Sequence, residues 1–148
     1  MSDVKITGHW DAKLYDETGS LKGEVSGKNV ICTAGKTALV NYLVSAAVSA
    51  TRNPFYFVAI GTGGTAETAA DTSLSSESAR ATGTASSTTA AVYTVYASFG
   101  AGVGTGAIVE YGLFDTSTGG TMFSRDTEAV LNKGASDTLT VFTKVTLS

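Results

Sequence analysis

Alternation of apolar and polar residues is the dominant pattern at the start of the chain. Between residues 8 and 16, Trp10, Ala12 and Leu14 fall on one face, and mostly charged or polar residues fall on the other. This period of two is typical of a strand with one buried face. Turn-forming residues at 16–20 separate it from a second alternating segment, so the pattern predicts a β-hairpin.

One segment has helical spacing instead. Thr33 is suited to cap the N-terminus of a helix, and apolar residues then recur every three or four positions from residue 34 to about residue 49. The residues of this apolar stripe are Ala38, Leu39, Tyr42, Leu43, Ala46 and Ala47. We expect the stripe to lie on a sheet and the helix to end at Asn53-Pro54.

The rest of the chain predicts further strands and one long loop. Strand patterns occupy residues 55–60, 91–99, 107–114, 121–127 and 138–147. Residues 61–89 are small and polar, so we expect a long surface loop there, with a short strand near 79–85. The length of 148 residues fits one domain. We therefore predict a single α+β domain (1–148), mainly β, with an antiparallel sheet or sandwich, one main helix and an extended segment at residues 1–7.

Composition favours a protein that works by packing against others. About half of the residues are Gly, Ala, Ser or Thr, and only 16% are charged, against a typical value of about 25%. Short side chains lose little rotamer entropy when they are ordered at a contact. The net charge is −3 and there is no block of Lys or Arg, so we expect no nucleic-acid partner. No apolar stretch is long enough to predict a membrane span, and no secretory signal pattern is present.

Two glycine-containing motifs invite a phosphate-binding interpretation. The run Gly61-Thr62-Gly63-Gly64 lacks the third glycine of the dinucleotide fingerprint and opens no apolar helix. Gly35-Lys36-Thr37 lacks the first glycine of a phosphate loop, since position 30 is Val30. We interpret the first as a strand exit and the second as the start of the helix, and we expect no cofactor.

The remaining reactive residues also favour structural roles. His9 is the only histidine, and Cys32, the only cysteine, stands in an apolar context, where a thiol usually packs as a small hydrophobe. A pair of the two remains an alternative. Acidic residues show no metal-ligand spacing, and the run that begins at Asp115 predicts a turn rather than a calcium loop. We expect neither a metal site nor catalytic residues.

Glu110 is the charged residue of greatest interest. It lies inside a predicted strand, between Val109 and Tyr111, where a buried charge needs a partner. Arg80 and Arg125 are the candidates. Our hypothesis is that a Glu110–Arg pair locks the strand to a loop or one subunit to another.

Several segments, in this order, resemble small particle proteins of tailed bacteriophages, namely head decoration (cement) proteins and the N-terminal domains of tail-collar fibres. They are residues 28–35 (KNVICTAG), 58–63 (VAIGTG), 71–74 (DTSL) with Glu77 and Arg80, 108–115 (IVEYGLFD) and 133–141 (KGASDTLTV). Collar-like relatives usually carry Arg at the position of Val109. No fibre shaft follows residue 148, which favours a stand-alone particle protein.

The resemblance implies a non-enzymatic structural component of the virion. A capsid decoration protein that binds the major capsid protein or other virion subunits, as a homo-oligomer, is the first expectation. A tail, neck or collar adaptor is the alternative, and a carbohydrate-binding module or hydrolase is a third, with Trp10, Tyr93 and Tyr96 as sugar-stacking candidates. The expected interface residues are Ser2, Asp3, Val4, Lys5, Ile6, Thr7, Asp71, Leu74, Glu77, Arg80 and Glu110.

Overall fold

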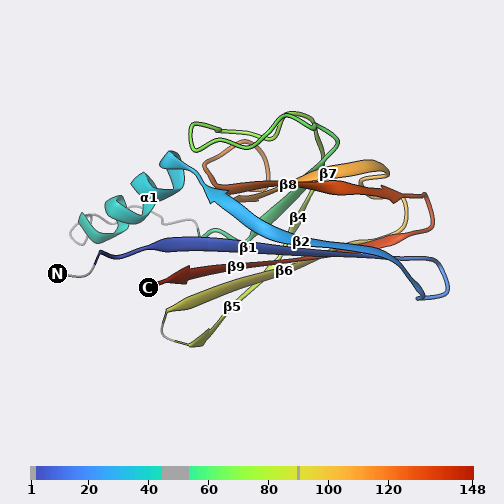
Figure 1. Cartoon of the computed structure of the whole chain (residues 1–148), viewed down its shortest axis with the longest axis horizontal. Coiled ribbons are helices and arrows are strands. Elements are labelled where there is room, and N and C mark those ends of the chain that lie inside the picture. The colour runs from blue at the N-terminus through green and yellow to red at the C-terminus, as the bar shows by residue number, and fades with distance from the viewer. Residues whose placement is uncertain (1–2, 45–53, 90) are drawn as a thin grey trace.

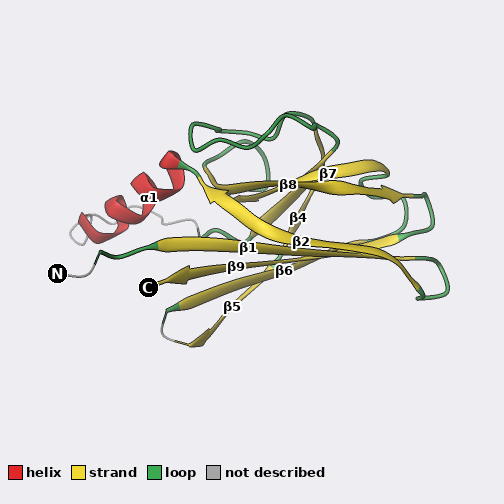
Figure 2. Cartoon of the chain, in the orientation of Figure 1, coloured by secondary structure: helices red, strands yellow, loops and turns green. Residues whose placement is uncertain are grey.

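The computed structural model describes residues 3–44, 54–89 and 91–148 of the chain. Within these residues, nine antiparallel strands and one helix form a mainly β fold (Figures 1 and 2), which confirms the predicted fold class. The elements are β1 (Ile6–Tyr15), β2 (Leu21–Ile31), α1 (Thr33–Val44), β3 (Phe57–Gly61), β4 (Glu77–Thr82), β5 (Thr84–Thr89), β6 (Val92–Phe99), β7 (Gly106–Phe114), β8 (Met122–Lys133) and β9 (Thr138–Leu147). Their order in the sheet is β4-β3-β7-β8-β2-β1-β9-β6-β5.

Two bent segments fold this sheet into two layers. Strand β2 pairs with β1 along most of its length, and then with β8 at Val30 and Ile31. At the other side, β4 lies on β3 while β5 lies on β6, and only Gly83 separates the two strands. A Cβ atom at Gly83 would lie 2.5 Å from Cγ1 of Val95 and 2.8 Å from the carbonyl oxygen of Tyr56. The corner therefore requires glycine.

The main core lies between the two layers. The inward faces of the strands supply its largest apolar side chains, among them Trp10, Ile60, Phe99, Leu113 and Leu139, all at most 1% exposed. Figure 1 shows β1, β9 and β6 side by side in one layer and β7 and β8 in the other. A smaller cluster lies on the outer face of the layer that contains β7 and β8, where the loop at residues 62–76 covers it. It consists of Cys32, Ala59, Leu74, Phe114 and Met122.

The helix begins where the sequence predicts but packs less completely. Ala38, Leu39 and Tyr42 contact the core, whereas Leu43, which was also expected on the buried stripe, is 82% exposed. That part of the prediction is wrong, because α1 packs against β8 at one end of the sheet and not along a full sheet face. Ala46, Ala47 and the predicted end at Asn53 lie outside the described residues. Among the described residues, no helix is both long enough and apolar enough to cross a membrane.

The predicted loop and the predicted N-terminal segment are both shorter than expected. The segment 61–89 contains two strands, β4 and β5, so the loop is confined to residues 62–76. Ile6 and Thr7 already belong to β1, where they pair with Leu147 and Thr146. The backbone of Lys5 also bonds to Ser148 in both directions. Sheet pairing with the C-terminal strand thus holds residues 5–7, and of the described residues in this segment only 3 and 4 extend beyond it.

Candidate functional site

A buried ion pair on the outer side of β7 and β8 holds the loop at residues 62–76. Arg125 Nη2 lies 3.1 Å from Glu110 Oε1, and the two residues are 1% and 0% exposed. The period of two places Arg125 and Thr127 on the opposite face of β8 from Ser124 and Asp126. The pair therefore faces the loop, which passes over β7 and β8 in Figure 1.

Glu110 also accepts hydrogen bonds from the loop backbone. Its Oε2 atom accepts from the amides of Gly63 and Ser76 at 2.7 and 2.8 Å, and Oε1 accepts from the amide of Ser75 at 2.7 Å. With the two contacts from Arg125, these bonds occupy the acceptor sites of the carboxylate. The hydrogen-bonding capacity of this carboxylate is therefore used within the fold, to hold the loop.

Arg125 connects the Glu110 carboxylate to the middle of the loop, between residues 65 and 75. Its guanidinium donates to Asp71 Oδ2 at 2.9 Å, to the carbonyl of Thr65 at 2.7 Å and to Ser75 Oγ at 3.0 Å. Burial alone would raise the pKa of Asp71, but hydrogen bonds from Thr68 and Arg125 outweigh it and lower the pKa. The hypothesis that a Glu110–Arg pair locks strand to loop is confirmed at the level of contacts, with Arg125 as the partner.

The glycine run at the end of β3 lets the backbone approach this ion pair closely. A Cβ atom at Gly63 would lie 2.4 Å from Glu110 Oε2, and one at Gly61 would lie 2.8 Å from the same atom. The backbone must approach the carboxylate closely, which only glycine permits. The amide of Gly63 is thereby committed to Glu110, which agrees with interpreting the run as a strand exit.

Arg80 does not pair with Glu110, so that alternative is wrong. Its guanidinium binds both oxygens of Glu77, at 2.6 and 3.0 Å, and stacks 3.6 Å from the ring centroid of Phe114. It also donates to the carbonyls of Thr116 and Gly119. Arg80 therefore fixes the turn between β7 and β8.

Several expected interface residues are internal. Leu74 and Glu110 are buried, and the Arg80 side chain is only 7% exposed. These three position the loop and the turn and do not form a contact surface themselves. Asp71 and Glu77 keep partly exposed side chains, at 24% and 33%.

A group of buried polar side-chain atoms between the two layers was not predicted from the sequence. Asp126 is 1% exposed, and neither of its carboxylate oxygens has a hydrogen-bond partner among the described residues. The same holds for the Tyr111 hydroxyl, the Asn29 amide and the Trp10 indole nitrogen. Tyr111 pairs with Asp126 across the strands, and its ring contacts Trp10. Burial, with the nearby Glu128 carboxyl adding to it, raises the pKa of Asp126 to about 8.

His9 and Cys32 have different surroundings. His9 lies on the outer face of β1, where Nε2 is 3.3 Å from Asp11 Oδ1. Cys32 is fully buried, and burial raises the pKa of its thiol to about 11. A protonated, inaccessible thiol is a poor nucleophile, so the arrangement offers no support for a catalytic pair.

The other candidates for binding chemistry are largely structural in this fold. Trp10 is 1% exposed and Tyr96 is 47% exposed, while the Tyr93 hydroxyl donates to the carbonyl of Phe55. Asp115 accepts from the amide of Thr121, as predicted for a turn. Among the described residues, no group of three or more His, Cys, Asp or Glu side chains is placed to hold a metal ion.

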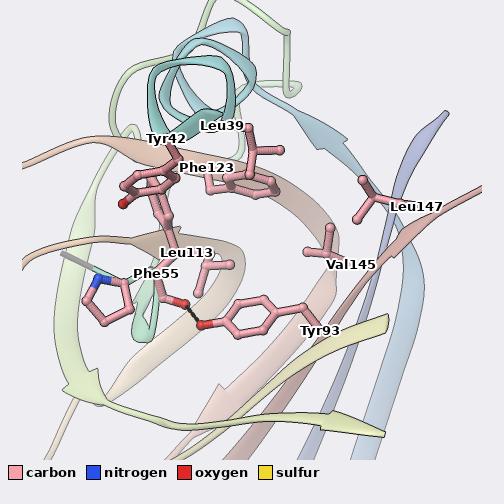
Figure 3. Close-up of a pocket in the computed structure, with 9 residues that line it drawn as sticks. Leu39, Tyr42, Phe55, Tyr93, Leu113, Phe123, Val145 and Leu147 are labelled. Atoms are coloured by element: carbon pink, nitrogen blue, oxygen red, sulfur yellow. Dashed lines mark hydrogen bonds between the residues drawn. The ribbon is translucent and has the colours of Figure 1, made fainter. Parts of the chain in front are cut away.

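An apolar cavity of about 630 Å³ lies at the end of the sheet next to α1 (Figure 3). Leu39 and Tyr42 of α1 line one side, and Tyr93, Val145 and Leu147 line another. The hydroxyl of Tyr93, which could orient a ligand, already donates to Phe55.

No protein-family model matches the chain, and comparisons with curated proteins and with solved structures likewise find no match.

Proposed function

We propose that the chain is a non-enzymatic structural subunit of a tailed-bacteriophage virion. In this proposal it is a head decoration protein that binds the major capsid protein or other virion subunits as a homo-oligomer. Binding of this kind stabilises the assembled shell by mass action, because the bound state is favoured. The proposal rests on the resemblance of the sequence segments described above, together with the geometry of the loop anchor.

The observation that carries the proposal is the convergence of these segments on one internal anchor. The segments at 58–63, 71–74 and 108–115 supply Gly63, Asp71 and Glu110, which are joined through Arg125. The motifs thus form a loop support whose polar groups are paired with one another. Such use of the motifs favours a scaffold over a reaction centre, in which a charged group would be left free for a substrate.

The surface supports the same class of function. Large apolar side chains on several elements are at least a third exposed: Val4, Leu21, Val40, Leu43, Tyr96, Val103, Val130, Phe142 and Leu147. They stand among many small residues, and contact with a neighbour would remove them from water at little entropic cost. Five of these side chains stand on hydrogen-bonded strands, whose backbone is already ordered before association.

A tail, neck or collar adaptor is the second candidate. The two differ in copy number, since a decoration protein follows the capsid lattice and an adaptor follows the rotational symmetry of the tail. Quantitative gel analysis of purified virions should show the chain in a fixed, near-stoichiometric ratio to the major capsid protein. A few copies per particle would favour the adaptor, and absence from virions would overturn both.

A carbohydrate-binding module is a weaker third candidate. Of its three aromatic candidates, Tyr96 alone is largely exposed, because Trp10 belongs to the core and the Tyr93 hydroxyl is bonded internally. A glycan array of the free protein tests it directly. We expect no binding, and glycan binding that is lost in Tyr96→Ala would replace the structural proposal.

A further inference from the structure

A row of basic residues, one histidine between two lysines, crosses the outer face of β2, β1 and β9. His9 lies opposite Lys28 on one side and opposite Lys144 on the other. Because Trp10 and Ala12 of β1 point into the core, the alternate residue His9 points outward. Both lysines are exposed, and the His9 side chain is 42% exposed.

Within the described residues, the two lysines of this row are not compensated by an ion pair. Asp11 lies 3.3 Å from His9 Nε2, but neither lysine forms an ion pair with any of the residues that the structure describes. A carboxylate placed over His9 would therefore find an exposed ammonium group on each side, one from β2 and one from β9.

The row borders a shallow depression that offers polar contacts. The depression has a volume of about 440 Å³ and is lined by Thr7, Gly8, His9, Lys28, Lys144 and Thr146. The two threonines are opposite each other in the β1–β9 pairing. Ammonium groups with neighbouring hydroxyls are donors that suit a carboxylate.

The neighbouring row of side chains on the same face indicates which class of molecule this surface binds. It contains Asp11, Phe142 and Tyr96, each opposite the next across β1, β9 and β6. Phe142 and Tyr96 are 36% and 47% exposed. The aromatic pair favours a protein partner, because aromatic residues are enriched at protein interfaces. The carboxylate of Asp11 would repel the phosphate groups of a nucleic acid, whose binding needs many phosphate contacts.

We propose that this surface, formed by His9, Lys28, Lys144, Phe142 and Tyr96, docks an acidic segment of a neighbouring virion subunit. One or two carboxylates of the segment bind between Lys28 and Lys144, and an apolar side chain next to them packs on the aromatic pair. The inference rests on the proposed function and names the surface through which that function is exercised.

A peptide titration tests the chemistry of the surface without the particle. The probe is an acetylated peptide that contains three Asp residues around one Phe, and the readout is the amide chemical shifts of the protein. We expect shifts confined to β1, β2, β9 and β6, and a loss of affinity of about tenfold or more for Lys28→Glu/Lys144→Glu, since like-charge contacts strongly oppose association. The control Lys36→Glu changes charge on α1 and should bind as the wild type does.

Two comparison ligands decide the class of partner. Inorganic phosphate and a thymidine oligonucleotide are titrated at the same ionic strength. Weaker binding of both than of the peptide supports the proposal. Equal or tighter binding of either, or unchanged peptide affinity in the charge-reversal variant, overturns it. Matching thermal unfolding curves of the variants exclude misfolding as the cause of any loss.

Decoration of particles separates this inference from the function on which it rests. Virions that lack the chain are incubated with wild-type, charge-reversed or Lys36→Glu protein and are then sedimented. Binding of the wild type and the control with loss of the charge-reversed variant supports both proposals. Equal binding of all three overturns the docking surface but leaves the structural function standing. Failure of the wild type to bind overturns the function and the inference with it.

Discussion

Arg125 Nη2 and Glu110 Oε1 lie 3.1 Å apart on two neighbouring strands, and water reaches neither residue to any extent. Ion pairs as buried as this one do not automatically stabilise a fold, because desolvation of the two charges opposes their attraction. Here three backbone amides of the loop complete the carboxylate shell. The pair is therefore best understood as the anchor that gives the loop at residues 62–76 one conformation.

Removal of the arginine should strongly destabilise the chain. In Arg125→Ala the carboxylate of Glu110 stays buried without its counter-charge, and we expect a loss of about 3–5 kcal/mol in the free energy of unfolding. Urea denaturation measures it. Lys36→Ala, on the exposed side of α1, serves as the control and should change the free energy by less than about 0.5 kcal/mol. A similarly small effect of Arg125→Ala would show that the pair does not anchor the loop.

Neutralisation of the glutamate should also be costly, and the two residues should be coupled. In Glu110→Gln one oxygen becomes an NH₂ group that faces other donors, so we expect a loss of about 1–3 kcal/mol. Combined with Arg125→Met, the loss should be clearly smaller than the sum of the single losses. Melting temperatures of the two single variants and the double variant give the coupling. If Glu110→Gln melts and assembles like the wild type, the lock hypothesis is wrong.

Two adjacent glycines provide a matched test of the loop geometry. Alanine at Gly63 would place Cβ 2.4 Å from both Glu110 Oε2 and Ser75 Cβ, whereas alanine at Gly64 meets nothing within 4 Å. We expect Gly63→Ala to lower the free energy of unfolding by about 1–3 kcal/mol, the range for overpacked sites. Gly64→Ala should be neutral or slightly stabilising. Equal effects of the two substitutions would contradict the close approach of the backbone to the carboxylate.

Asp126 should make stability depend on pH. Its pKa is raised to about 8 in the folded chain by burial and the Glu128 carboxyl, while in the unfolded chain it is near 3.9. Between these values the folded state holds one more proton than the unfolded state, so stability is highest below pH 4 as far as this group is concerned. The free energy of unfolding falls by up to about 1.4 kcal/mol per pH unit as pH rises from about 4 to about 8, and this contribution is fully lost once pH has risen through the folded-state pKa.

Urea denaturation between pH 5 and pH 9 measures this slope, and Asp126→Asn is the matched variant. The amide cannot ionise, so the variant should lose the part of the slope that Asp126 contributes. Its stability relative to the wild type should therefore improve as pH rises. Parallel pH profiles for the two proteins would show that Asp126 is already ionised in the fold at neutral pH.

The sequence was sufficient for elements with a clear periodic pattern. The first hairpin follows from alternation around Trp10, and the helix start follows from the apolar spacing after Thr33; the structure has both. The need of Glu110 for an arginine partner also followed from its place inside a strand. These predictions depend on local pattern and on the cost of burying a charge, which a sequence shows directly.

Other features of the fold depend on contacts between distant segments, which the pattern of hydrophobic residues does not show. One short strand was expected near residues 79–85, but the structure has two, β4 and β5; they are rich in small residues and form through pairing with β3 and β6 on either side of Gly83. The choice of Arg125 over Arg80 follows from the register of β8. That strand carries polar residues on both faces, so the sequence does not show that Asp126 points inward while Arg125 points to the loop.

Quantification of the chain in purified virions tests the central claim most directly. The account predicts that the chain co-purifies with assembled particles through a density gradient, in a constant ratio to the major capsid protein. It also predicts that purified chain restores this ratio on particles that lack it. A chain that stays at the top of the gradient, or that turns over a substrate as free protein, would contradict the account.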